Sequence, residues 1–105
     1  MAQFDVHRNL GAHRHDIPFV VVVQSRRLDA YRRRVVIPLV LASAVQAVEP
    51  NLNPTFHIES LDVILHPLEI VSIAVERLGE RVGTLGGEGD RIIAAIDNVI
   101  SRAWK

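Results

Sequence analysis

Residues 89–105 carry the only convincing helical pattern in this sequence. A helix of this length is marginal in water by itself, so its apolar side must lie on another part of the protein. Five apolar residues fall at helical spacing and form one stripe: Ile92, Ile96, Val99, Ile100 and Ala103. Asp90 is expected to cap the helix, and the glycines before it predict a flexible approach. We therefore expect a β domain to pack on this helix and the end of the helix to meet a partner.

Most of the remaining chain is typical of short strands. Alternating or β-branched runs predict strands in six places: 3–8, 19–25, 34–41, 55–59, 61–66 and 69–75. The run at 19–25 should be buried on both faces, and a tight turn at Glu59-Ser60 should join a hairpin. Pro38 cannot donate to a ladder, so its strand is expected to lie at an edge, to bulge or to end there. Residues 76–85 contain two glycines and are predicted as a loop.

These elements predict a mainly β protein, a small antiparallel barrel or sandwich with a single C-terminal helix. The 105 residues are expected to form one domain, 1–105, with the barrel at about 3–85 and the helix at about 90–105. Hydrophobic residues make up 49% of the chain, which is enough for a core, and the aromatic share of 5% makes that core aliphatic.

Composition also excludes several classes of function. The absence of cysteine excludes disulfides and thiolate metal sites. Twelve basic residues balance twelve acidic ones, which counts against a general nucleic-acid binder. There is no secretory signal, and no apolar run reaches the ~20 residues that span a bilayer. We expect a soluble cytoplasmic protein that makes no contact with a membrane.

Five short motifs occur in one order along the chain, and together they are more specific than any of them alone. They are Gln3-Phe4, Val23-Gln24-Ser25, Arg34-Val35-Val36-Ile37-Pro38-Leu39, Pro54-Thr55-x-His57-Ile58 and Ile92-Ile93-Ala94-Ala95-Ile96-Asp97. In this order and spacing the chain resembles the CcdB family, the toxin half of a bacterial toxin–antitoxin pair.

The resemblance implies a fold and a function. CcdB proteins have an SH3-like antiparallel barrel with a C-terminal helix, form homodimers and have no enzymatic activity or cofactor. They bind the A subunit of DNA gyrase, trap the complex of gyrase with cleaved DNA and so block replication. A CcdA-like antitoxin neutralises them, and the two proteins together bind operator DNA and repress their operon.

The same resemblance implies where gyrase binds. In the family this contact runs through the end of the helix, which corresponds here to Ile100, Ser101, Arg102, Ala103, Trp104 and Lys105. Arg102 and Ala103 stand where the family typically has Gly-Ile, and two residues follow them. Val22 stands where the family often has Asp, and residues 43–53 are shorter than in the best-known branch. Trp104 either closes the helix face on the barrel or serves as an anchor for a partner.

Arginines gather in the connection after the second predicted strand. They are Arg26, Arg27, Arg32 and Arg33, with Arg34 next to them. Such a run is usually a solvated loop, in which Asp29 and other acids pair with the cations. The functional alternatives are the acidic segment of an antitoxin, for which Arg26, Arg27, Arg32 and Arg33 are the candidates, or DNA phosphates.

The histidines suggest weaker hypotheses. His57 and Glu59 lie two apart on a predicted strand and so share a face, and such a pair could do acid–base work. No partner nucleophile can be placed, and a hydrogen-bonded structural histidine is the alternative. His13 and His15 lack a third and a fourth ligand, so no metal site is expected. The glycine run at 83–89 lacks the context of a phosphate-binding loop, and we interpret it as a hinge.

Two rival functions remain open from the sequence. MazF/Kid toxins are related barrels that cut RNA, and this chemistry would need a base with cationic stabilisers. His57 and the arginines at 26–34 are the only candidates for these roles. The second rival is a non-toxic protein that keeps only antitoxin binding and operon repression, which the altered end of the helix favours.

Overall fold

The structure, a computed structural model, describes residues 2–100. Within them the chain forms a seven-stranded sheet and one α-helix. The elements are β1 (Asp5–Asn9), β2 (Phe19–Val22), β3 (Arg33–Leu41), β4 (Thr55–Ile58), β5 (Leu61–Leu65), β6 (Val71–Ala74), β7 (Leu78–Thr84) and α1 (Gly89–Ile100). The strands at 19–25, 34–41, 55–59, 61–66 and 69–75 are confirmed within a few residues at each end.

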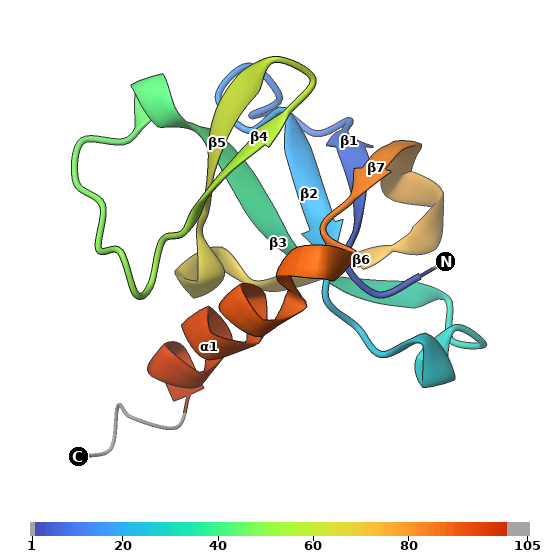
Figure 1. The fold of residues 1–105 in the computed structure, drawn as a ribbon. Coiled ribbons are helices and arrows are strands. Elements are labelled where there is room, and N and C mark those ends of the chain that lie inside the picture. The colour runs from blue at the N-terminus through green and yellow to red at the C-terminus, as the bar shows by residue number, and fades with distance from the viewer. Residues whose placement is uncertain (1, 101–105) are drawn as a thin grey trace.

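All the strands pair antiparallel in a single sheet. Its order is β4-β5-β3-β2-β1-β7, and β6 pairs with β3 beside this path. The sheet curls into a half-barrel, and α1 lies below it (Figure 1). The predicted fold class is therefore confirmed: a mainly β, antiparallel barrel-like sheet with one C-terminal helix.

The β4–β5 hairpin turns where the sequence predicts. Glu59 and Ser60 have φ values of 50° and 67°, the left-handed geometry of a two-residue hairpin turn. Phe56 and Val63 pair across the hairpin and are both buried. β4 alternates exposed and buried residues, and this period-2 pattern together with the turn fixes the register of the hairpin.

Strand β3 is the centre of the sheet, which corrects the expectation that Pro38 marks an edge, a bulge or an end. β3 pairs with β2 along one side, and its other side pairs first with β6 and then with β5. Pro38 falls between the registers of β6 and β5, and its carbonyl oxygen accepts from the His66 N–H at 3.1 Å. In a strand the N–H and C=O of one residue point to the same side. The N–H that Pro38 lacks would therefore point to the position between β6 and β5, where neither strand is in register with β3.

Strand β7 corrects the prediction of a loop at 76–85. It pairs with β1, and two register shifts interrupt this pairing, so the segment lacks a clean apolar alternation. Gly79 is required for the approach of the two strands, because a Cβ there would lie 2.7 Å from the backbone oxygen of Arg8. β1 itself begins at Asp5, since Phe4 adopts a φ of 70°.

The helix begins one residue before the predicted cap. Asp90 is the second residue of α1, and the 3₁₀ turn η5 (Gly86–Glu88) leads directly into the helix, so Asp90 is not the N-cap. Gly89 lies against Phe4, and a Cβ there would be 2.7 Å from Cε2 of the ring. The predicted flexible approach is thus a short 3₁₀ turn followed by a close contact.

One side of α1 packs on the sheet, and the other does not. Ile92 and Ala95 are completely buried, and Ile96 packs on the same core from its edge. Ile100, which the predicted stripe includes, is 66% exposed, and Ile93 is exposed too. Figure 1 shows α1 extending away from the strands towards its C-terminal end, so its last turn has no sheet beneath it. Ala103, also in the predicted stripe, lies outside the described residues.

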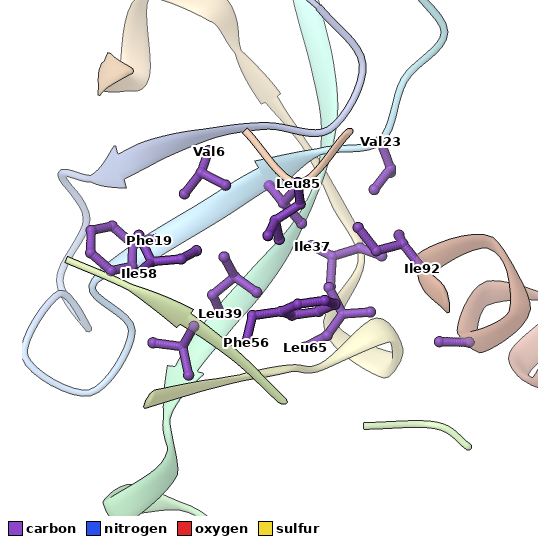
Figure 2. Packing of buried hydrophobic residues seen from close by; sticks show 13 residues of the cluster. Val6, Phe19, Val23, Ile37, Leu39, Phe56, Ile58, Leu65, Leu85 and Ile92 are labelled. Atoms are coloured by element: carbon purple, nitrogen blue, oxygen red, sulfur yellow. The ribbon is translucent and has the colours of Figure 1, made fainter. Parts of the chain in front are cut away.

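The core is aliphatic, as the composition predicts. Val6 of β1, Leu39 of β3 and Phe56 of β4 point into one interior, which Ile92 closes from α1 (Figure 2). A smaller cluster on the other face of the sheet contains Val20, Val22 and Val36. β2 is thus buried on both faces, which confirms the prediction for the run at 19–25.

The close approach of β7 to β1 generates a stability prediction. Gly79→Ala should lower the free energy of unfolding by about 1–3 kcal/mol, because the added carbon overlaps backbone atoms of Arg8. Gly83→Ala is a matched control on the same strand, since a Cβ there has no atom within 4 Å. We expect the control to stay within about 0.5 kcal/mol of the parent in urea unfolding. Equal losses in the two variants would contradict a special role for Gly79.

Candidate functional site

The end of α1 is the first candidate surface. Of the six residues expected to bind gyrase, Ile100 is described and is exposed, whereas Ser101, Arg102, Ala103, Trp104 and Lys105 lie outside the described residues.

More apolar surface lies close to this helix. Ile93 is exposed on α1, and Leu68 and Ile70 are exposed in and after the 3₁₀ turn η3 (Pro67–Glu69). The helix and this turn contact each other. Large apolar side chains on two elements in contact are a typical feature of a protein–protein interface. Sequence reasoning placed Ile70 in the strand predicted at 69–75 and gave Leu68 no role, so it missed both as exposed apolar surface.

The arginines of the predicted cluster lie in different environments. Arg26 and Arg27 lie on the 3₁₀ turn η1 (Arg26–Leu28) and are exposed. Arg32 pairs with Glu76 at 3.1 Å, on the turn η4 (Val75–Arg77). The pKa of the Glu76 carboxyl is lowered by a hydrogen bond from its own backbone N–H and then by Arg32.

Arg34 has a structural role that separates it from its neighbours. Its side chain is only 6% exposed, and it donates to the backbone oxygens of Tyr31 (2.6 Å), Arg33 (2.9 Å) and Asp29 (3.1 Å). Three carbonyls on one guanidinium fix the path of the 29–33 loop. Unlike Arg34, the four arginines that the sequence nominates, Arg26, Arg27, Arg32 and Arg33, are exposed.

A pocket of about 390 Å³ opens beside these arginines. It is lined by Gln24, Leu28, Tyr31, Arg32 and Arg33. The Gln24 amide donates to the oxygens of Leu28 and Arg33 and accepts from the Val35 N–H, so it joins both ends of the loop. Leu28 and Tyr31 are exposed, and they give the pocket apolar walls under a cationic rim. Sequence reasoning missed this pocket, although Gln24 belongs to a motif that carries the family resemblance.

His57 does not join the arginine cluster. Its Nδ1 lies 2.9 Å from Oδ1 of Asp62 on β5, and both side chains are exposed. Glu59, the expected acid–base partner, pairs instead with Arg8 at 2.8 Å. Figure 1 shows the turn η1 and the β4–β5 hairpin at opposite ends of the molecule. The structure therefore does not bring His57 together with the arginines that a MazF/Kid-like chemistry would need.

Arg8 bridges the opening of the half-barrel. It bonds Glu80 on β7 at 2.6 Å and Glu59 in the β4–β5 turn at 2.8 Å, and so connects the two ends of the strand order. The hydrogen bond to Glu80, followed by that to Glu59, raises the pKa of the Arg8 guanidinium. Glu59 is partly exposed and Glu80 mostly exposed, so water screens both pairs and the bridge adds little to stability.

The remaining motifs show no arrangement for chemistry. His13 and His15 are exposed in a loop, and no group of three or more potential ligands in residues 2–100 is placed to hold a metal ion. In the glycine run, the Gly86 N–H donates to Oγ1 of Thr84, so a side chain of the run itself accepts this hydrogen bond. Within the same residues, no helix has the length and apolarity to span a bilayer.

The fold defines a class: a curled antiparallel half-barrel with one C-terminal helix, of the MazF/CcdB-like type. The chain belongs to the CcdB family, a family of toxins of toxin–antitoxin systems, because the family model described as "CcdB protein" matches residues 3–101. This match confirms the resemblance on which the sequence prediction depends.

A solved structure supports the fold independently. It is described as an endoribonuclease in complex with its cognate antitoxin from a mycobacterial species. The chain is similar to it with a TM-score of 0.73 and 14% identity, over 100% of this chain and 99% of the other. At this identity the likeness extends to the fold alone. A comparison with curated proteins gave no match.

The contrast between two arginines of one cluster gives the second prediction. Arg34→Gln should lower the free energy of unfolding by about 3 kcal/mol or more, because the backbone oxygens of Tyr31 and Asp29 lose a charged donor and the Asp29 carboxylate loses its ion-pair partner. Arg26→Gln, the matched control, should change it by less than about 0.5 kcal/mol, since Arg26 is exposed. Thermal and urea unfolding measure both changes, and a stable Arg34→Gln protein would refute the structural role.

Proposed function

We propose that this protein is the toxin of a type II toxin–antitoxin module, a non-enzymatic homodimer that poisons DNA gyrase. It binds the gyrase A subunit, holds the enzyme on cleaved DNA and so blocks replication. The observation that carries the proposal is the family match, which extends through α1 to residue 101. It ends in the part of the chain where Ile100 is exposed on a helix turn without a sheet beneath it.

The gyrase contact runs through the end of the helix, Ile100 to Lys105. Ile100 contributes an apolar side chain that nothing in residues 2–100 buries. Trp104 is the only tryptophan of the chain, and a central tryptophan anchor typically contributes about 2 kcal/mol or more of binding free energy. α1 is anchored to the core through Ile92 and Ala95.

The antitoxin is a CcdA-like protein that neutralises the toxin, and toxin and antitoxin together bind operator DNA. Arg26, Arg27, Arg32 and Arg33 supply the positive surface for its acidic segment, and the pocket between Leu28 and Tyr31 supplies apolar walls. Because the net charge of the chain is zero, these local cations rather than an overall field select an acidic partner.

The non-toxic alternative is supported by the residues at the end of the helix. Arg102 and Ala103 replace the Gly-Ile of the family, so antitoxin binding and operon repression can persist without gyrase poisoning. The RNA-cutting alternative loses support, because His57 pairs with Asp62 at the opposite end from η1.

Induction in cells tests the proposal. Expression should stop growth of cells with ordinary gyrase and spare cells whose gyrase A subunit resists such toxins. A chain lacking Trp104 and Lys105 should be harmless in both, because the anchor is gone, while it keeps the parent's circular dichroism and its antitoxin complex.

The outcomes separate the three functions. Equal toxicity in resistant cells, together with cleavage of RNA by the purified protein without metal, would establish the endoribonuclease instead. Normal growth in all cells with a preserved antitoxin complex would establish the non-toxic co-repressor. Unchanged toxicity of the shortened chain would show that the end of the helix is not the contact.

The homodimer makes a separate prediction. Light scattering coupled to size exclusion should give the mass of a dimer at micromolar concentration. Ile93→Asp should shift this equilibrium towards the monomer, because it charges the exposed apolar side of α1. Leu10→Asp is a matched control, since Leu10 is exposed far along the chain from the helix. A monomeric parent protein would contradict the dimer, and equal effects of the two variants would move the interface away from α1.

A further inference from the structure

Within residues 2–100, strand β6 has one edge without a partner strand. In this part of the chain it pairs with β3 alone, and the Val75 N–H donates to the Arg32 oxygen at 2.9 Å at the end of this ladder. Hydrogen-bonded residues alternate along an antiparallel ladder, so Ile73 and Val71 also bond to β3. Ser72 and Ala74 therefore turn their N–H and C=O groups away from the sheet. Such an edge is a ready template for another strand.

Arg33 covers part of this edge. Its guanidinium donates through Nε to Oγ of Ser72 at 2.8 Å and through a terminal nitrogen to the backbone oxygen of Ser72 at 2.7 Å. Both partners are neutral, and the side chain is exposed, so a carboxylate would be a stronger acceptor for the same guanidinium. An arriving strand would replace this cap with a backbone N–H, and Ser72 would keep a donor for its oxygen.

The same arginine also lines the pocket described above. Arg33 and Arg32 form its cationic rim, and Leu28 and Tyr31 form its apolar wall. A segment in register with β6 would thus have an edge for its backbone, arginines for its carboxylates and a pocket of about 390 Å³ for an apolar side chain. Two acidic residues flank β6 in the chain. Glu76 follows the strand and is already paired with Arg32, and Glu69 precedes the strand.

We propose that β6 binds an extended acidic and apolar segment as an added strand, with Arg33 transferring its hydrogen bonds from Ser72 to a carboxylate of that segment. In the function proposed above, on which this inference rests, the segment belongs to the antitoxin. Strand addition of this kind draws its affinity from main-chain hydrogen bonds and its selectivity from side-chain pockets.

The test uses the full-length protein and a defined peptide, acetyl-Glu-Val-Glu-Ile-Glu-Val-Glu-amide. Nuclear magnetic resonance titration should shift the amide signals of Ser72 and Ala74, and hydrogen exchange at these two amides should slow. A peptide of the same sequence with N-methyl groups on alternate residues keeps the charge and loses the donors. It should bind at least about tenfold more weakly if main-chain pairing supplies the affinity.

Two substitutions at one position separate the backbone from the side chain. Ser72→Ala keeps the outward N–H and should retain affinity within about threefold, whereas Ser72→Pro removes that donor and should lower affinity at least about tenfold. A proline is tolerated there because the lost N–H does not face β3. Arg33→Gln should also weaken binding about tenfold, while Arg77→Gln, an exposed arginine outside the pocket, should not.

The results that overturn the proposal are distinct. Absence of binding at millimolar peptide, or equal affinity of the N-methylated peptide, would exclude strand addition. Protection of Ser72 and Ala74 that rises with protein concentration in the absence of peptide would assign the edge to a second copy of the chain. None of these measurements depends on growth arrest, so a failure here would leave the gyrase experiment unaffected, and a failure there would leave this binding result unaffected.

Discussion

One edge of strand β3 pairs with two other strands, and the rest of the structure depends on this arrangement. β6 pairs along Arg33–Val36 and β5 along Leu39–Leu41, so the two separate at Pro38. A pocket of about 570 Å³ lies at this junction, with Pro38 and His66 in its lining. The division brings β5 and β4 to the core and leaves β6 at the margin with one edge unpaired. The position of β6 at the margin of the sheet follows from this branching.

The sequence predicts the elements whose burial is uniform. β2 is buried on both faces and β4 on one, and their patterns are clear for that reason. The sequence does not predict β7, because this strand is half-exposed, contains glycines and pairs with shifts of register. Its residues therefore show no period-2 alternation of apolar and polar side chains. Asp90 has the chemistry of a cap, but the contact of Gly89 with Phe4 sets where the helix begins. Contacts between distant parts of the chain decide such details, and local propensity cannot show them.

The candidate site likewise has features that the sequence predicts and features that depend on contacts between distant segments. The composition of residues 26–34 indicates a cationic surface, but it does not show which arginine builds the loop and which are available to a partner. Arg33 and Arg34 are neighbours whose side chains leave the strand on opposite faces. One consequently covers an exposed edge, and the other enters the protein to bind backbone oxygens. The Leu28–Tyr31 wall and the exposed Leu68 depend on packing between segments and have no sequence pattern of their own.

The pairing of β1 with β7 has a consequence for the time at which the protein becomes active during its synthesis. Residues 5–9 form the first strand, yet one of its two neighbours is made of residues 78–84. The Phe4 ring likewise packs against Gly89, which is synthesised later still. The ribosome must therefore release most of the chain before the half-barrel can close, and such long-range pairing is slow. A growing chain has no complete surface for a target. A partner that is already present would thus meet the protein at the moment it first folds.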